Sequence, residues 1–126
     1  MIKGIGTDIL AIEKLNPILK KEDYLNDSFI KKTYTSLEIE LAESRPLPLY
    51  CYATRFAGKE AVFKALTVTG EDLRLNEIEI LSDATGKPYV VLHGNAALLA
   101  QKKEISQVLI SLSYEDDYAI AYAIAE

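Results

Sequence analysis

The chain has 126 residues, of which 49% are hydrophobic and 26% charged, and its formal net charge is -5 at pH 7. These proportions are typical of one soluble globular domain, and they exclude a disordered, collagen-like or disulfide-scaffold protein. The acidic balance leaves no broad basic surface for nucleic acid.

The single Cys51 cannot form an internal disulfide, which fits a reducing compartment. The N-terminus lacks the apolar segment and cleavage site of a signal peptide. No apolar run approaches the roughly 20 residues of a membrane span. We therefore expect a single cytoplasmic domain over residues 1–126, with neither nucleic acid nor a membrane as a partner.

The N-terminal segment predicts a short strand over residues 2–8, in which two glycines allow close backbone approach. Asp8 then stands where the strand ends. Apolar residues recur at helical spacing from Ile9 onward, and Pro17 should cut or bend that helix. The chain therefore starts as a strand followed by an interrupted helix.

Two further helices are predicted in the first half of the chain. Thr35 and Glu38 have the spacing of a capping box, which predicts a helix that runs to about Ser44. Two prolines then close that stretch. A long helix begins near Leu49 and continues to about Thr67.

The second half of the chain alternates strands with one short helix. Its predicted elements are, in order, a strand over 73–81, a turn over 83–88, a strand over 89–92, a helix capped by Asn95 through Lys103, and strands over 108–113 and 118–125. The hairpins favour antiparallel pairing. The sequence therefore predicts an α+β fold, with a mostly antiparallel sheet packed against a long helix.

Glu60 is the most informative charged residue. On a helix it lies about 40° from Phe56 and about 60° from Phe63 around the axis. A carboxylate between two aromatic rings is costly unless it is paired or bound to a metal. Lys64 follows one turn later, so an ordinary Glu–Lys helix pair is the alternative interpretation.

Asp8 is the second candidate, and it also has two interpretations. It either caps a helix that begins at Ile9 or supplies a second carboxylate to a site. Two carboxylates suit Mg²⁺, a hard cation that shares its coordination shell between protein, water and substrate phosphate. His93 and Cys51 lack the neighbours that nucleophilic or zinc sites require, so we expect packing roles for both.

Two segments, residues 4–9 and 55–64, together resemble the signatures of the holo-acyl-carrier-protein synthases, the small phosphopantetheinyl transferases. The turn at 86–88 and the closing strands match as well, so the resemblance spans essentially the whole chain. It implies a phosphopantetheinyl-transferase-like single domain. It also implies Mg²⁺-dependent transfer of phosphopantetheine from coenzyme A to a serine of apo acyl carrier protein, with adenosine 3',5'-bisphosphate as the other product.

The resemblance implies roles for individual residues. Asp8 and Glu60 are expected to hold Mg²⁺ against the pyrophosphate of coenzyme A, and Lys64 to neutralise phosphate charge during transfer. The general base is either Glu60 or a metal-bound water. Arg55 and Lys59 are expected to contact the phosphates of the coenzyme, and Pro88 to help shape the nucleotide pocket.

The resemblance also implies two kinds of protein contact. Carriers dock on basic residues of the first helix in this family, and the lysines at that place here are Lys14, Lys20 and Lys21. Members of the family are trimers with the coenzyme site between neighbouring subunits. We therefore expect a homotrimer in which Asp8 and Glu60 of one chain meet residues of the next.

Two positions depart from the family pattern. Tyr114 stands where a histidine of the nucleotide pocket is usual, and Gly58 replaces an alanine at a cost of about 1 kcal/mol in helix propensity. A non-catalytic homologue that binds coenzyme A or a carrier protein is the competing interpretation. The joint presence of Asp8, Glu60 and Lys64 argues against it.

Overall fold

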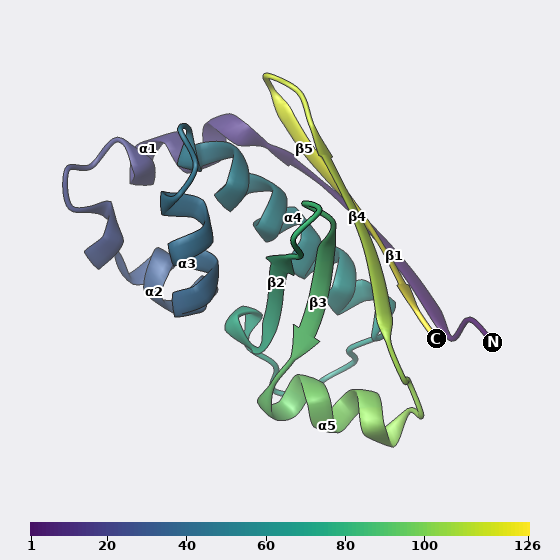
Figure 1. The fold of residues 1–126 in the computed structure, drawn as a ribbon. Helices are drawn as coiled ribbons and strands as arrows, with labels where there is room; N and C mark the ends of the chain where they lie inside the picture. Colours follow the sequence, from purple (N-terminus) through teal and green to yellow (C-terminus); the bar gives the residue numbers. More distant parts are fainter.

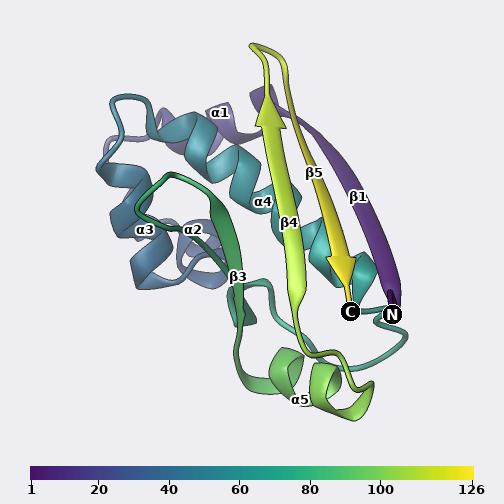
Figure 2. The ribbon, with the colours of Figure 1, turned by 45° about the vertical axis from the view of Figure 1, so that its right-hand side comes forward.

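The computed structural model describes residues 1–126 and is organised around one long helix, α4 (Pro48–Ala65). A sheet of β1 (Gly4–Ala11), β5 (Tyr118–Ala125) and β4 (Val108–Tyr114) covers one side of α4 (Figure 1). Figure 2 shows these three strands side by side along the helix. The remaining elements are the 3-10 turns η1 (Ile12–Leu15), η2 (Tyr24–Asn26) and η3 (Leu75–Glu77), the helices α1 (Asn16–Leu19), α2 (Ser28–Thr33), α3 (Ser36–Glu43) and α5 (Gly94–Lys102), and the strands β2 (Ile78–Ser82) and β3 (Pro88–Leu92).

All strand pairs are antiparallel, in a three-stranded sheet of order β1-β5-β4 and a separate β2–β3 hairpin. In the larger sheet Gly4 pairs with Ala125 and Asp8 with Ala121. The predicted α+β class, with antiparallel strands packed against a long helix, is therefore confirmed. None of the helices is long and apolar enough to cross a membrane.

The contact between β1 and α4 is made by backbone atoms. A β-carbon on Gly4 would lie 1.9 Å from the carbonyl oxygen of Ala65, and one on Gly6 would lie 2.0 Å from that of Ala61. Only glycine permits such an approach. The inward residues of β5 are also small, since all four are alanines: Ala119, Ala121, Ala123 and Ala125. The sheet therefore lies unusually close to the helix axis.

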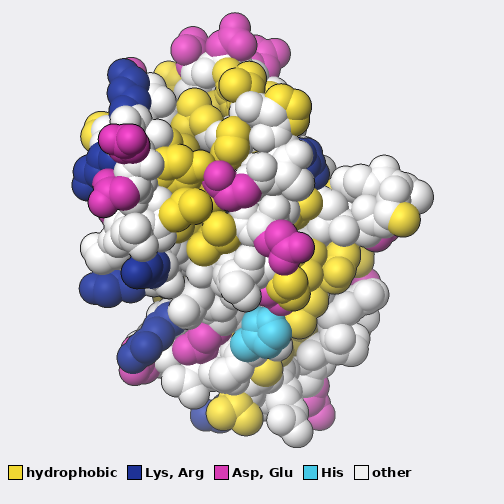
Figure 3. Space-filling model, turned by 60° about the vertical axis from the view of Figure 1, so that its left-hand side comes forward, with side chains coloured by type: hydrophobic (Ala, Val, Ile, Leu, Met, Phe, Trp, Pro, Cys, Tyr) yellow, Lys and Arg dark blue, Asp and Glu magenta, His cyan; other side chains and the backbone are white.

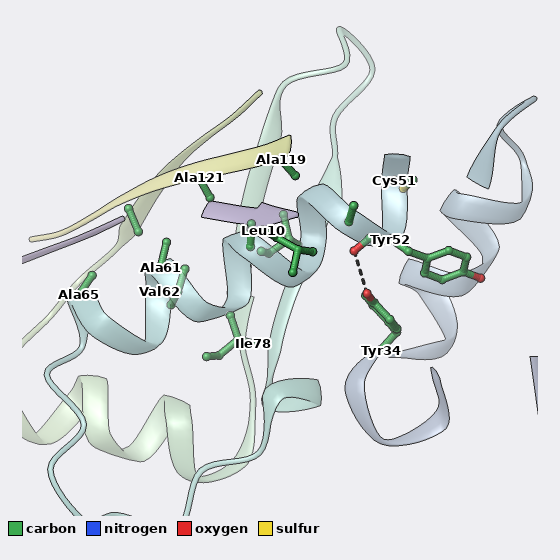
Figure 4. Close-up of a cluster of buried hydrophobic side chains, with 14 of the residues drawn as sticks. Leu10, Tyr34, Cys51, Tyr52, Ala61, Val62, Ala65, Ile78, Ala119 and Ala121 are labelled. Carbon is green, nitrogen blue, oxygen red and sulfur yellow. Dashed lines mark hydrogen bonds between the residues drawn. The ribbon is translucent and has the colours of Figure 1, made fainter. Parts of the chain in front are cut away.

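The core fills the space between α4 and its neighbours. Figure 4 shows Leu10 and Ala119 from the sheet on one side of α4 and Ile78 from the hairpin on another. At the other end of the cluster the hydroxyl of Tyr34 donates to the carbonyl oxygen of Tyr52 at 2.7 Å (Figure 4). Every buried side-chain nitrogen or oxygen in the structure has a hydrogen-bond partner.

A fully buried ion pair joins α3 to α4. Lys59 Nζ lies 2.7 Å from Glu38 Oε1, and the two side chains are 0% and 1% exposed. Burial lowers the pKa of the Lys59 ammonium, and the adjacent Glu38 carboxylate opposes that shift. Glu38 is also the third residue of α3, where it completes the capping box predicted with Thr35. The Glu38 carboxylate thus accepts a backbone N–H at the start of α3 and also pairs with the Lys59 ammonium of α4.

The first strand is longer than predicted, and the predicted helix from Ile9 is wrong. β1 continues to Ala11 because residues 9–11 pair with β5. The chain becomes helical only from Ile12 onward, first in η1 and then in α1. Pro17 lies in the first turn of α1 rather than interrupting a helix, which is the position where its missing N–H costs nothing.

Two other boundaries differ from the prediction. The strand expected over 73–81 begins only at Ile78, since the carbonyl groups of Leu75 and Ile78 accept hydrogen bonds from the buried Lys59. The cap expected at Asn95 is also wrong, because the helix begins at Gly94 and the Asn95 side chain donates to the Asp72 carbonyl. Both differences arise from side-chain partners that lie far away in the sequence.

The glycine contacts predict a large loss of stability for alanine at position 6 and a small change for alanine at position 58. Gly6→Ala should lower the free energy of unfolding by about 3 kcal/mol or more, because its new β-carbon meets a backbone oxygen that cannot move alone. In the control Gly58→Ala, the β-carbon meets only the side-chain ends of Ile80, Ile110 and Leu112. Its gain of about 1 kcal/mol in helix propensity should offset most of the crowding. Urea unfolding measures both, and a Gly6→Ala protein as stable as the parent would contradict the contact.

Candidate active site

Asp8 lies in the middle of β1, on the face that turns toward α4. Side chains alternate along a strand, so Asp8 shares the inner face with Gly6 and Leu10, whereas Ile9 is 63% exposed on the outer face. The Asp8 carboxylate is one-fifth exposed. The interpretation of Asp8 as a helix cap is therefore wrong, because Asp8 lies within the strand and Ala11 precedes the first helical turn.

Lys64 on α4 reaches across to β1. Its ammonium donates to the Thr7 carbonyl at 2.9 Å and to Asp8 Oδ1 at 3.3 Å. No ion pair joins Lys64 to Glu60, although the two are one helical turn apart. The ordinary Glu–Lys helix pair is therefore not formed, and Lys64 instead connects the helix to the strand that carries Asp8.

Glu60 lies half-buried on α4, within the electrostatic influence of both residues. Burial raises the pKa of the Glu60 carboxyl, the charge of Asp8 raises it further, and Lys64 lowers it. Two carboxylates from different elements thus repel each other at a partly desolvated place. No group of three or more His, Cys, Asp or Glu side chains in the structure could hold a metal, so a cation here would depend on these two oxygen donors, water and substrate.

Lys59 does not belong to this group, which corrects its expected contact with coenzyme phosphates. Its ammonium has three hydrogens, and they go to Glu38 Oε1 at 2.7 Å, the Leu75 carbonyl at 3.0 Å and the Ile78 carbonyl. The residue is completely buried. It has neither an exposed atom nor a free donor for a phosphate.

Arg55 is buried as well, but its guanidinium lies at the wall of a hollow of about 290 Å³. It donates to the Ser82 hydroxyl at 2.6 Å and to the Ile80 carbonyl at 3.4 Å. The hollow is lined by Arg45, Pro46, Leu47, Tyr50, Cys51, Thr54, Arg55 and Tyr114. Two cations and two aromatic rings in one hollow suit an anion attached to a planar group.

Pro88 begins β3 directly opposite Ser82, the residue that accepts the hydrogen bond from Arg55. The hairpin thus brings Pro88 to the same end of the molecule as Arg55. Tyr114 stacks on Tyr50 with ring centroids 4.7 Å apart and 22° between the planes. Arg45 and Tyr50 were missed by the sequence reasoning, and no spacing rule joins them to Tyr114.

The three lysines expected to receive a carrier protein differ in their surroundings. Lys14 and Lys20 are exposed, whereas Lys21 forms an ion pair with Asp27 at 2.7 Å. Figure 3 shows one face of the molecule, with Lys and Arg side chains along one margin and Asp and Glu side chains among them. Of the three lysines, Lys21 therefore already has an acidic partner.

Cys51 and His93 have the packing roles expected of them. Burial raises the pKa of the Cys51 thiol, which makes it a poor nucleophile. His93 Nε2 lies 3.0 Å from Glu79 Oε1, and the other Glu79 oxygen accepts a hydrogen bond from the Thr35 hydroxyl. These contacts tie the start of α5 to the hairpin and to α3.

Comparison with known proteins agrees with this arrangement. The family model described as the 4'-phosphopantetheinyl transferase superfamily matches residues 4–123. A holo-acyl-carrier-protein synthase from Alkaliphilus oremlandii is 42% identical over 125 residues, which cover 99% of each chain. A crystal structure of the synthase from Neisseria meningitidis is similar with a TM-score of 0.83 and 32% identity, over 100% of this chain and 99% of that one.

A third similar structure holds a ligand. It is the Helicobacter pylori holo-acyl-carrier-protein synthase in complex with coenzyme A, with a TM-score of 0.79 and 26% identity over 97% of this chain and 99% of that one. The match of the family model covers nearly the whole chain, and the relative from Alkaliphilus oremlandii is matched over 99% of its length. The chain belongs to the 4'-phosphopantetheinyl transferase superfamily, as an enzyme of the holo-acyl-carrier-protein synthase family.

Proposed function

We propose that this enzyme transfers phosphopantetheine from coenzyme A to a serine of an apo acyl carrier protein, in a Mg²⁺-dependent reaction that releases adenosine 3',5'-bisphosphate. The observation that carries the proposal is the meeting of Asp8, Glu60 and Lys64 where β1 crosses α4. Two carboxylates and one ammonium from distant parts of the sequence have no structural need to meet on a partly exposed surface.

The donor set of Asp8 and Glu60 fits Mg²⁺. Hard oxygen ligands are the ones that this ion prefers, and one or two carboxylates with substrate phosphate are its usual protein partners. The mutual repulsion that helps to raise the pKa of Glu60 is the kind that a divalent cation relieves. When bound, Mg²⁺ would neutralise the pyrophosphate and stabilise the leaving phosphate.

The reaction forms a bond from the carrier serine oxygen to the β-phosphorus of coenzyme A. The bond between that phosphorus and the bridging oxygen breaks, and the bridging oxygen leaves with adenosine 3',5'-bisphosphate. Lys64 is placed to neutralise phosphate charge, and the serine proton is taken either by Glu60 or by a water of the metal site. The hollow beside Arg55 and Pro88 suits the nucleotide end of the coenzyme.

The carrier protein is proposed to dock beside this site on Lys14, Lys20 and Lys21, with the exposed Lys14 as the principal contact because Asp27 already pairs with Lys21. Exposed charges of this kind act mainly on the rate of encounter. A cytoplasmic place of action stays a prediction, made from the single cysteine.

We further propose that the enzyme is a homotrimer whose sites lie between subunits. The outer face of the β1-β5-β4 sheet supports this, because a large apolar surface on a small chain favours association. Its exposed members are Ile5, Ile9, Leu109, Tyr118, Ile120 and Tyr122, each between 38% and 71% exposed.

Removal of either proposed metal ligand should stop the reaction and leave the fold intact. Asp8→Asn and Glu60→Gln are each expected to lower the rate of Mg²⁺-dependent transfer by on the order of 100-fold or more, measured as the mass gain of an apo carrier. The control Glu40→Gln changes an exposed carboxylate of α3 and should keep the parent rate. Normal turnover by Glu60→Gln would contradict the metal assignment. Binding of coenzyme A by the unaltered protein without transfer would favour a non-catalytic homologue.

The sheet face can be tested by light scattering. The parent protein should have about three times the 14.0 kDa mass of the chain, and Ile5→Asp should reduce it to the single-chain mass because a charge cannot be buried unpaired in an apolar interface. Leu98→Asp is the matched control, since Leu98 is similarly exposed on α5, away from the sheet. A parent that is monomeric at micromolar concentration would refute the trimer.

Charge reversal at Lys14 should weaken carrier recognition alone. Lys14→Glu is expected to raise KM for the carrier strongly, with KM for coenzyme A almost unchanged, and the parent should lose carrier affinity as salt rises from low to moderate concentration. Lys102→Glu, a charge reversal on α5, should leave both values alone. An unchanged carrier KM in Lys14→Glu would place the docking surface elsewhere.

A further inference from the structure

The buried ion pair of Lys59 and Glu38 calls for a role beyond stability. Both side chains are withdrawn from water, at 0% and 1% exposure. The desolvation of two charges usually cancels most of their attraction, and apolar residues of similar size often replace such a pair without loss of stability. We therefore ask which elements of the fold the pair of Lys59 and Glu38 holds in place.

The carboxylate end of the pair is held rigidly. Glu38 Oε1 accepts the backbone N–H of Thr35 at 2.9 Å in addition to the Lys59 ammonium, and Glu38 Oε2 accepts the backbone N–H of Ile80 at 2.8 Å. Glu38 is thus bound to both α3 and β2. Its position is set by backbone groups, and it cannot follow a movement of α4.

The ammonium end is held as firmly. Besides Glu38, Lys59 Nζ donates to the carbonyl groups of Leu75 and Ile78, and it lies 5.6 Å from the centre of the Tyr34 ring. All three donors are directed at fixed acceptors. The side chain of Lys59 therefore connects α4 to α3, η3 and β2 by hydrogen bonds.

On the sheet side, α4 is held by a second constraint at the next residues along the chain. The carbonyl group of Ala61 lies against Gly6 of β1. Glu60 stands between Lys59 and Ala61, and consecutive side chains differ by about 100° around a helix. A rotation of the helix about its own axis would break the contacts of Lys59 and move Glu60 relative to Asp8.

We propose that Lys59 is a positioning residue, whose buried pair with Glu38 fixes the rotation of α4 and so holds Glu60 toward Asp8. The inference rests on the proposed function of Asp8 and Glu60 as a cation site. It gives Lys59 a role that acts through Glu60, with no contact to coenzyme A. It also separates the two lysines of the 55–64 segment, because Lys64 faces the site whereas Lys59 supports it from within the core.

The test replaces the whole pair with apolar residues and measures cation affinity with coenzyme A present and no carrier protein, since substrate phosphate is part of the expected coordination shell. The double variant Glu38→Leu/Lys59→Met should unfold at a lower urea concentration than the parent, because it leaves the N–H groups of Thr35 and Ile80 without their acceptor. In the folded double variant the dissociation constant for Mn²⁺ should rise tenfold or more, as is typical when the residues that orient metal ligands are lost. Its kcat should fall while KM for the carrier stays unchanged. Lys103→Met is the matched control, because Lys103 also donates to two carbonyl groups, those of Leu66 and Thr67, at the far end of α4. It should lose stability and keep the parent Mn²⁺ affinity.

A folded double variant with parent Mn²⁺ affinity and kcat would overturn the inference. If the double variant does not fold, Glu38→Asp decides the question, since it keeps the charge and withdraws the carboxylate by one methylene group. Mn²⁺ affinity that falls in Glu38→Asp supports the positioning role, and unchanged affinity refutes it. Two results would refute the proposed cation site itself and the inference with it. One is a parent protein that binds no Mn²⁺, and the other is an Asp8→Asn variant with the same Mn²⁺ affinity as the parent.

Discussion

The structure depends on the backbone contact between the first strand and the long helix. The carbonyl oxygens of Ala65 and Ala61 occupy the space that β-carbons at positions 4 and 6 would need. Because the strand lies directly on the helix, the next inward residue, Asp8, comes within reach of the Lys64 ammonium. A larger residue at either glycine would lift the strand and separate the two carboxylates. The glycines of the N-terminal segment therefore serve the site as much as the fold.

The sequence was sufficient where the signals are local. Thr35 and Glu38 predicted a capping box that the structure contains with both of its hydrogen bonds, and the turn at residues 83–88 separates the two strands of a hairpin. The end of the first strand could not be predicted, because residues 9–11 are apolar at a spacing that suits a helix. Their conformation is decided by pairing with β5, more than a hundred positions away.

The same distinction applies to the candidate site. Glu60 and Asp8 could be chosen from the residues, since an acidic group among apolar ones is conspicuous in a sequence. The role of Lys59 could not, because a lysine next to a glutamate on a helix looks like a surface residue. Lys59 is buried because its partners are Glu38 on α3 and Ile78 on β2, and helical periodicity along α4 cannot predict contacts with other elements. Tyr114 is comparable: its stacking on Tyr50 joins a strand end to the first turns of α4.

The pairing of β1 with β5 has a consequence for how the enzyme is made. Gly4 is hydrogen-bonded in register with Ala125, so the first strand to leave the ribosome has no partner until the fifth has been synthesised. Loop closure over such a distance slows folding, since the entropy of the intervening chain is lost before the contacts form. Until then β1 has no hydrogen-bonding partner, because it is the edge strand of the sheet and pairs with β5 alone. A chain that ends before β5 cannot form this sheet, because β5 is the central strand that joins β1 to β4.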